Sequence, residues 1–407
     1  MPWIYRMTML ASLAVLPLYI YVGRRLATAV STISPRFQEP KKIRRRIVFP
    51  VIFWFYLFPL TMVIYYLNGN FRQLFVYNPQ LQWQDYLIMY PSWCGLIAVL
   101  EIFPMFAALD IIRFVGRWKI FRKDKEKPRW QWMVYAKIGI ALFFLVYVGI
   151  RTYLDTSHVR ISTSEVAIEN LPGEFNGLRL CVFGDIHMDR YTTEDKLTKL
   201  KDVLRSGDED LLIFTGDLIS KGFDYIHRAL DVVGNPQAKV AALACMGDHD
   251  FWTDAQGIPP AMEKRGWTFL QNQHYLIPYK GRRILVTGLT YVYSSRMSMY
   301  QLKKLLGSAP EADLKILVLH QPMAPAVETA AEYGYHLLLA GHTHGGQIVH
   351  HVLGFPISPG QEETRFCWGR HRVKGMQVVV TNGIGLTLAP VRYHAPSEIT
   401  KLTLVKK

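Results

Sequence analysis

Residues 340–347 read Ala340-Gly341-His342-Thr343-His344-Gly345-Gly346-Gln347, a glycine-rich turn that carries two histidines one residue apart. The turn follows an apolar run at 336–340, which is typical of a buried β-strand. Glycines let the backbone adopt positive φ and allow a ligand to approach closely. Imidazoles presented together by such a turn are candidate metal ligands. Because an isolated histidine pair is more often a surface or hydrogen-bonded pair, this interpretation requires partners elsewhere in the chain.

The second part of the chain alternates apolar runs with polar helical segments, which predicts an α/β domain with one core. Helices are predicted over 193–204 and 225–233. Strands are predicted over 178–183, 211–214, 240–246, 284–289, 316–319, 337–339 and 378–380. In such sheets, active sites gather at the carboxyl ends of the strands. The strand ends of this chain carry Asp185, His187, Asp217, Asp248, His249, Asp250, His320, His342 and His344.

This series of strand ends favours a metal centre. A single Gly-Asp after a strand is more often a turn or a helix cap, but that explanation does not account for the whole series. Mixed carboxylate and imidazole ligands suit Mn, Fe, Zn or Co better than a pure Mg or Ca site. The set is large enough for two divalent ions with one bridging carboxylate. Two ions ~3.5–4 Å apart can clamp the attacking and leaving oxygens of phosphoryl transfer.

The ordered blocks resemble the signature of the calcineurin-like metallophosphoesterase superfamily, which runs Asp-x-His, Gly-Asp, Gly-Asn-His-Asp/Glu, His and Gly-His-x-His. The resemblance covers roughly residues 160–405. It implies a catalytic domain over 154–407, built as an α/β/β/α sandwich of two mixed sheets. A narrower resemblance, to the membrane-anchored YkuE-like subgroup, rests on the segments 171–178, 345–347, 382–385 and 390–393.

The resemblance also implies a role for each site residue. It assigns Asp185, His187 and His344 to one ion, Asp248, His320 and His342 to the other, and Asp217 to the bridge between them. His249 would contact the phosphate and protonate the leaving alkoxide, and Asp250 is the second catalytic candidate. A hydroxide bridging the ions would be the nucleophile, because the ions lower its pKa. Arg392 is a candidate for phosphate contact, and the alternative for this residue is a surface ion pair.

The chain departs from the family pattern at one of these positions. The family usually has Asn where this chain has Asp248. A carboxylate can ligate through the same oxygen, so we expect an active site rather than a degenerate one. The additional negative charge is expected to strengthen metal binding, to disfavour dianionic monoesters and to raise the pKa of His249.

The first third of the chain, residues 1–153, has the composition of a transmembrane region. Trp and Tyr cluster at the ends of its apolar stretches, as in an interfacial belt. Arg24 and Arg25 follow the first stretch and disfavour cleavage of a signal peptide. Glu101 lies inside the third stretch and is either a functional carboxylate or a residue paired within the bundle. The stretches approach the ~20 residues that a helix needs to span the hydrocarbon core, and they cover 7–22, 47–67, 86–112 and 132–153.

The formal net charge of +15 is concentrated in this first third. Residues 1–151 hold 20 Lys/Arg and 6 Asp/Glu, whereas residues 152–407 hold 27 Lys/Arg and 26 Asp/Glu. The nearly neutral second part argues against nucleic acid as a partner. The basic residues lie in the first and third loops between the apolar stretches, so the positive-inside rule puts those loops in the cytoplasm. The catalytic domain is then predicted to lie outside the cytoplasm.

Three hypotheses for the function follow from these patterns. The first is a phosphoesterase of the inner or plasma membrane that acts on a phosphomonoester or phosphodiester of a lipid or lipid-linked compound. The second is hydrolysis of UDP-2,3-diacylglucosamine, which some similar proteins carry out. It conflicts with the predicted orientation, because that lipid is made on the cytoplasmic side. The third is a membrane scaffold or sensor with the same fold, which metal analysis and an assay with bis-p-nitrophenyl phosphate would distinguish from an enzyme.

Overall fold

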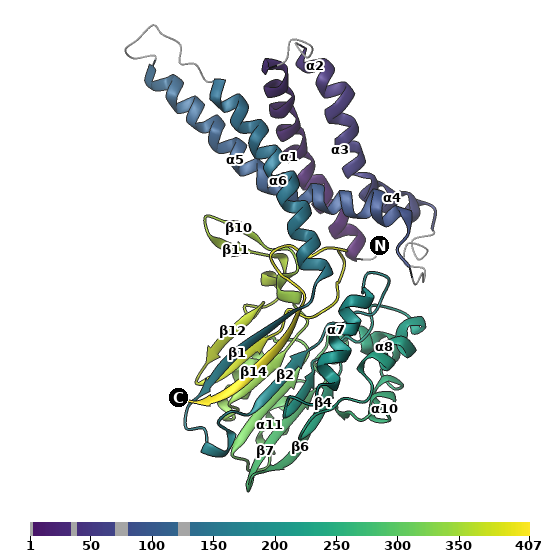
Figure 1. Cartoon of the computed structure of the whole chain (residues 1–407), viewed down its shortest axis with the longest axis vertical. Coiled ribbons are helices and arrows are strands. Elements are labelled where there is room, and N and C mark those ends of the chain that lie inside the picture. Colours follow the sequence, from purple (N-terminus) through teal and green to yellow (C-terminus); the bar gives the residue numbers. More distant parts are fainter. Residues whose placement is uncertain (1–2, 34–38, 70–79, 121–130) are drawn as a thin grey trace. The chain divides into compact units, whose positions relative to one another are not determined.

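The computed structural model describes residues 3–33, 39–69, 80–120 and 131–407. The chain divides into two compact units, Met1–Thr152 and Tyr153–Lys407. Helices make up the described part of the first unit, and two sheets flanked by helices make up the second (Figure 1).

Among the described residues, three helices that begin in the N-terminal unit are long and apolar enough to cross a membrane. All three extend beyond the predicted stretches 7–22, 86–112 and 132–153. Hydropathy marks the part of a helix that suits the hydrocarbon core, and a helix can continue past it. The qualifying segments are Leu10–Ile33 of α1 (Trp3–Ile33), Asp85–Gly116 of η4 (Asp85–Met89) and α5 (Tyr90–Ile120), and α6 (Gln131–Ser157).

The predicted span 47–67 is bent rather than straight. The helices before and after Tyr56 meet at 56°. Pro59 accounts for the break, because it lacks an N–H and its ring would clash with the carbonyl of Phe55 in a continuous helix. The described residues thus contain three candidate spans, or four if the bent pair counts as one. The pieces are α2 (Pro40–Ile43), η2 (Arg44–Val48), α3 (Phe49–Phe55) and α4 (Leu57–Leu67).

Ion pairs connect three helices of this unit. The carboxylate of Asp110 in α5 lies 2.7 Å from Arg25 of α1 and 2.6 Å from Lys137 of α6. Tyr21 of α1 also donates to Asp110. Several basic residues of the first and third loops, on which the predicted orientation depends, lie outside the described residues. They are Arg36, Arg122, Lys123, Lys125, Lys127 and Arg129.

The second unit contains two six-stranded sheets, each of which mixes parallel and antiparallel pairs. The first has the order β1-β14-β2-β3-β4-β5, with β1 Arg160–Ile168, β2 Arg179–Phe183, β3 Leu211–Phe214, β4 Ala241–Cys245, β5 Thr268–Leu270 and β14 Glu398–Lys406. The second has the order β12-β13-β9-β8-β7-β6, with β6 Gln273–Tyr279, β7 Arg282–Leu289, β8 Leu314–Leu319, β9 Leu337–Ala340, β12 Gly369–Val373 and β13 Met376–Val380.

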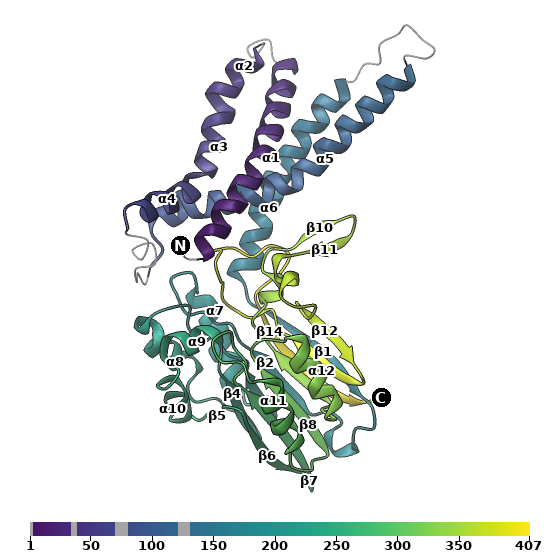
Figure 2. The same cartoon turned by 180° about the vertical axis from the view of Figure 1, so that it is seen from behind.

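Three buried clusters join the layers of this unit. Successive strand residues point to opposite faces, so Ile213 packs in a cluster shared by both sheets, while Leu212 faces the helices outside the first sheet. Those helices are α7 (Glu194–Arg205), α8 (Ile226–Val233) and α10 (Ile258–Glu263). The outer face of the second sheet packs against α11 (Met299–Gly307) and α12 (Ala324–Glu332), as Figure 2 shows. The predicted α/β class is confirmed.

The remaining elements are short and lie in the connections. Among them, the hairpin of β10 (His350–Val352) and β11 (Phe355–Ile357) follows the histidine turn, which itself forms η7 (His344–Gly346). The others are α9 (Asp248–Asp254), η5 (Gly173–Phe175), η6 (Phe223–Tyr225) and η8 (Pro359–Glu362). Because β2, β3 and β4 run parallel, and β7, β8 and β9 do too, the turns with the predicted ligands come together at the carboxyl ends of both sheets.

Candidate metal centre

The turns that leave the strands share an unusual backbone. Five of the predicted ligands have left-handed conformations, with φ between 43° and 74°. Non-glycine residues rarely adopt this region, and each instance costs about 1–3 kcal/mol that the surrounding structure has to offset. Sharp turns of this kind bring side chains from several strands back over the ends of the sheets. The five residues are Asp185, His187, Asp217, His342 and His344.

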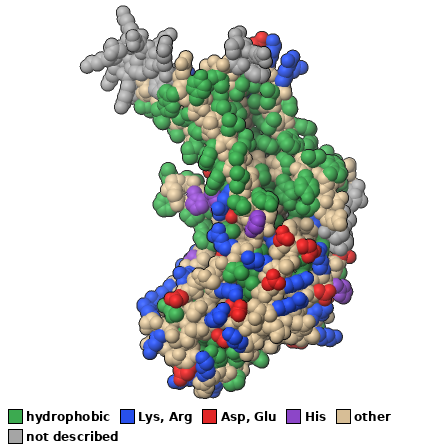
Figure 3. Space-filling model, in the orientation of Figure 1, with side chains coloured by type: hydrophobic (Ala, Val, Ile, Leu, Met, Phe, Trp, Pro, Cys, Tyr) green, Lys and Arg blue, Asp and Glu red, His purple; other side chains and the backbone are tan. Residues whose placement is uncertain are grey.

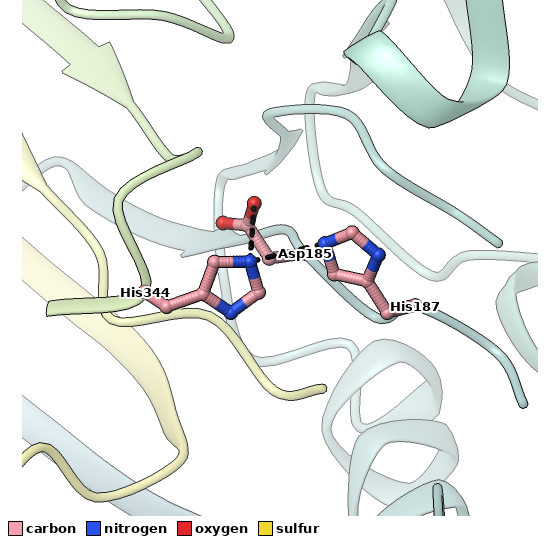
Figure 4. Close-up of side chains that lie close together, drawn as sticks. All are labelled: Asp185, His187 and His344. Atoms are coloured by element: carbon pink, nitrogen blue, oxygen red, sulfur yellow. Dashed lines mark hydrogen bonds and ion pairs between the residues drawn. The ribbon is translucent and has the colours of Figure 1, made fainter. Parts of the chain in front are cut away.

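One ligand group combines the turn after β2 with the histidine turn. Nε2 of His344 lies 3.0 Å from Nε2 of His187 and 3.7 Å from Oδ1 of Asp185, as Figure 4 shows. All three side chains are buried. Burial lowers the pKa of His187 and of His344 well below the usual value, so both rings are neutral and suited to bind a cation. Burial raises the pKa of Asp185 to about 6.

A second group combines the turns after β4, β8 and β9. Oδ2 of Asp248 lies 3.0 Å from Nδ1 of His342 and 3.4 Å from Nε2 of His320. The two rings are also close, with Nδ1 of His342 3.2 Å from Nε2 of His320. His320 donates from Nδ1 to the carbonyl of Thr215 at 2.8 Å, which leaves Nε2 directed at the carboxylates.

Asp217 stands between the two groups. Its Oδ2 lies 3.3 Å from Nε2 of His187 and 3.2 Å from Nε2 of His320. Its Oδ1 accepts the backbone N–H of His249 at 2.8 Å. The ligand atoms within each group lie within 4.8 Å of one another, so the donor set fits divalent ions with mixed oxygen and nitrogen ligands. The structure thus brings together all seven predicted ligands, and the ion that each one binds stays a prediction.

Comparison with known proteins agrees with this geometry. Residues 178–346 match the family described as calcineurin-like phosphoesterase. This part of the chain is a calcineurin-like phosphoesterase domain.

Relatives of the phosphoesterase domain include proteins named as transmembrane proteins and others that are not. The chain is 28% identical over 251 residues to the transmembrane protein with metallophosphoesterase domain of Danio rerio, which covers 59% of this chain and 56% of that protein. It is 26% identical over 260 residues to the uncharacterized metallophosphoesterase YkuE of Bacillus subtilis (63% and 89%). It is 28% identical over 235 residues to phosphodiesterase YaeI of Escherichia coli (56% and 82%). The chain thus spans little more than half of the Danio rerio relative.

The two predicted catalytic residues of the phosphoesterase domain have different surroundings. His249 is half-buried, and its ring lies 4.6 Å from that of His187. Its Nδ1 contacts the carbonyl of Ser220. Because a carbonyl can only accept, Nδ1 carries the hydrogen, and Nε2 is the nitrogen available for proton exchange.

Asp250 has a positioning role instead of the predicted catalytic one. It is fully buried and accepts the backbone N–H groups of Asp217 and Leu218, each at 2.8 Å. Burial and the neighbouring Asp217 carboxylate raise its pKa to about 7. Asp250 therefore fixes the turn that presents Asp217.

The structure also contradicts the predicted substrate contact of Arg392. The guanidinium is fully buried. It donates to backbone carbonyls, among them that of His344 at 3.0 Å and that of Gly385 at 2.8 Å. Further acceptors are the carbonyls of Asn382, Gly383 and Ala395. With its donors occupied in this way, Arg392 holds the histidine turn against the segment 382–395 and does not face a substrate.

Sequence patterns did not identify the residues that surround Asp248. Its Oδ1 accepts the backbone N–H of Tyr293 at 2.8 Å, and its Oδ2 accepts Nε2 of Gln321 at 2.7 Å. Arg296 donates to Oε1 of Gln321 at 2.7 Å and so fixes the orientation of the amide. On the other side, Glu363 lies 3.1 Å from Nε2 of His342. Tyr293, Arg296 and Glu363 lie outside the motif blocks, whereas Gln321 directly follows His320.

The donors around Asp248 match a carboxylate and not an amide. Both of its oxygens face N–H groups, and Arg296 prevents Gln321 from presenting its oxygen instead. An Asn at this position would turn its own NH₂ toward Tyr293 or toward Gln321. If the NH₂ turned toward Tyr293, it would face the backbone N–H of that residue, and two donors would meet. If it turned toward Gln321, it would replace the carboxylate oxygen nearest His342.

We therefore expect Asp248→Asn to weaken metal binding by roughly 10–100-fold, the size of effect typical of changes that disturb a metal site. Metal content after purification and titration with Mn²⁺ would measure the change. Asp231→Asn is the matched control, because this carboxylate is 73% exposed on α8. Unchanged metal content and affinity in Asp248→Asn would contradict the argument from donor matching.

Arg392→Lys tests the structural role of Arg392. A lysine has one amine in place of the fork of donors, so buried carbonyls lose partners, and each costs about 1–3 kcal/mol. We expect a clearly lower melting temperature of the purified full chain, measured by circular dichroism. The exposed Arg372→Lys should melt like the unsubstituted chain. A normal melting temperature with only a raised KM for substrate would restore the substrate contact.

Proposed function

We propose that this chain is a membrane-bound, metal-dependent phosphoesterase that hydrolyses a phosphomonoester or phosphodiester of a lipid or lipid-linked compound. The observation that carries the proposal is the position of Asp217. One carboxylate oxygen lies within 3.3 Å of a histidine from each ligand group. A carboxylate shared in this way is the arrangement expected of a two-ion site.

The chain's residues can supply the steps that such a reaction needs. Divalent ions held by the two groups would neutralise phosphate charge and lower the pKa of water. His249 is held through Nδ1 by the carbonyl of Ser220, which keeps the other ring nitrogen available to protonate a leaving oxygen. Asp250 and Arg392 fix the turns of Asp217 and His344, so the ligands are pre-organised.

The short link between helix α6 and the domain supports a lipid substrate. Helix α6 ends at Ser157 and strand β1 begins at Arg160, so only two residues lie between them. A catalytic domain with so short a tether cannot move far from the end of a candidate span. Phosphate groups carried by lipids are concentrated near that end. The domain is also nearly neutral, which disfavours nucleic acid as the substrate.

The proposed location is the extracytoplasmic side of a bacterial inner or plasma membrane. The support is the excess of Lys and Arg in the first and third loops of the N-terminal region. With four spans, this orientation puts the domain opposite those loops.

Asp217→Ala tests the proposed centre. The full chain, purified in detergent and supplied with Mn²⁺, should hydrolyse bis-p-nitrophenyl phosphate and at least one member of a panel of lipid phosphates. Asp217→Ala should lose more activity than the roughly 10–100-fold typical of outer-shell changes, because it removes a ligand common to both groups. The exposed Asp231→Ala is the matched control. If neither turnover nor bound metal is found in the unsubstituted chain, a scaffold role replaces the enzyme.

A reporter fused after Lys407 tests the orientation. A phosphatase that is active only outside the cytoplasm should be active in the fusion, and a fluorescent protein that matures only inside should be dark. The opposite pair of results would overturn the proposed side and would favour hydrolysis of UDP-2,3-diacylglucosamine.

A further inference from the structure

The hairpin of β10 and β11 exposes large apolar side chains. Leu353 at its tip is 94% exposed and Phe355 is 72% exposed, and Leu388 in a neighbouring loop is 63% exposed. No Asp, Glu, Lys or Arg occurs between residues 342 and 361. Figure 3 shows hydrophobic side chains over the projecting hairpin, whereas charged side chains are frequent on the rest of this face of the domain. We define the apolar rim as Val352, Leu353, Phe355, Ile357 and Leu388.

The turn at the tip of this hairpin makes a leucine there unexpected. Leu353 and Gly354 have φ values of 52° and 87°, which is the backbone of a tight hairpin turn with two left-handed residues. Two other hairpins of the domain have the same kind of turn, with Lys280 and Gly281 between β6 and β7, and Lys374 and Gly375 between β12 and β13. Those turns carry a lysine where this one carries a leucine. A leucine side chain is poorly solvated in water, and a leucine backbone disfavours the left-handed conformation, so both effects disfavour Leu353 at this turn.

The loop of Leu388 shows the same combination. Leu388 has a φ of 59°. Three of the other left-handed positions in the domain are Asn170, Asn235 and Asn272, and asparagine is among the residue types that tolerate this conformation best after glycine. Two exposed leucines in a costly conformation point to a contact with an apolar environment.

Gln347 joins the two parts of the rim. Its Nε2 donates to the carbonyls of Thr387 and Ala389 at 2.7 and 2.9 Å, and its Oε1 accepts the N–H of Thr387 at 2.9 Å. Gln347 also lies three residues before β10. The hairpin and the loop of Leu388 therefore share one anchor at their base.

The base of the rim is attached to the end of α6. The N–H of His394 donates to Asp155 at 2.7 Å, and the N–H of Arg392 donates to Thr156 at 2.8 Å. Tyr393, between them, exchanges backbone hydrogen bonds with Gln347 and Val349, each at 2.9 Å. Asp155 and Thr156 lie near the C-terminal end of α6, and the whole helix, Gln131–Ser157, is a candidate span. The base of the rim is thus hydrogen-bonded to the C-terminal end of this candidate span.

We propose that the apolar rim inserts into the interface of the lipid bilayer, beside the point where α6 leaves it. The rim is a second membrane contact, in addition to the candidate spans. Its side chains suit this place, because exposed aliphatic and aromatic groups with no charge among them are those that enter the headgroup and acyl boundary. The proposal does not depend on hydrolysis. A failure of the proposed activity would leave it intact, and the reverse also holds.

Fluorescent labelling at matched turns tests the proposal. The full chain, with Cys94→Ser, receives either Leu353→Cys or Lys374→Cys, two positions with the same turn backbone. The other native cysteines are buried. An environment-sensitive dye is attached, and the protein is placed at one copy per nanodisc of phosphatidylcholine and phosphatidylglycerol. We expect blue-shifted emission at residue 353, strong quenching by nitroxide lipids and weak quenching by iodide. The label at residue 374 should show no blue shift, weak quenching by nitroxide lipids and strong quenching by iodide.

Three results would overturn the proposal. One is a label at residue 353 with the same emission maximum and the same quenching as the label at residue 374. The second is a blue shift at residue 353 without quenching by nitroxide lipids, which would mean that the rim folds against protein. The third is a blue shift only in discs that hold two copies, which would make the rim a contact between chains. Phe355→Cys gives a second reading on the other strand if Leu353→Cys disturbs the turn, and it should match the expected result for residue 353.

Discussion

The arrangement of the domain depends on one carboxylate. Oδ2 of Asp217 has to lie within 3.3 Å of His187 from the first sheet and within 3.2 Å of His320 from the second. That condition fixes how the carboxyl ends of the two sheets meet. The left-handed turns satisfy it at a local cost, and buried polar groups offset that cost. Asp250 binds the backbone of the Asp217 turn, and Arg392 binds that of the histidine turn.

The sequence predicted the parts of the fold that have strong local signals. Buried parallel strands such as β3 and β8 are almost continuous apolar runs, and the polar residues after them supplied the predicted ligands, which the structure brings together. The predictions missed β1, β6, β12 and β14, because these strands carry many polar or exposed residues and are defined by their pairing partners. They also missed β5, β10 and β11, which are only three residues long each. The bend at Tyr56 had a visible cause in Pro59. The contacts of Gln321, Glu363 and Arg392 had no visible signal in the sequence, because each joins segments that are distant along the chain.

Apolar groups suited to a membrane occur in both units, as whole helices in the first and as a few exposed side chains in the second. In the first unit the apolar character is a property of whole helices, which hydropathy detects. In the second it is confined to a few side chains on tight turns, too few for a window average to register. The same segment that carries those side chains begins three residues after a predicted metal ligand, His344, at Gln347. The apolar rim and the predicted metal centre are therefore joined by a short stretch of the same chain segment.

The position of β14 affects how the domain can assemble. This strand pairs with β1 in parallel and with β2 in antiparallel orientation, so residues 398–406 lie between the first two strands of the domain. Until those residues have been synthesised, no strand lies between β1 and β2, and β1 is separated from the rest of the first sheet. The turn after β2 carries the predicted ligands Asp185 and His187, and β14 supports the strand that leads to this turn. Residues 398–406 have to leave the ribosome before β1 can join the rest of the first sheet.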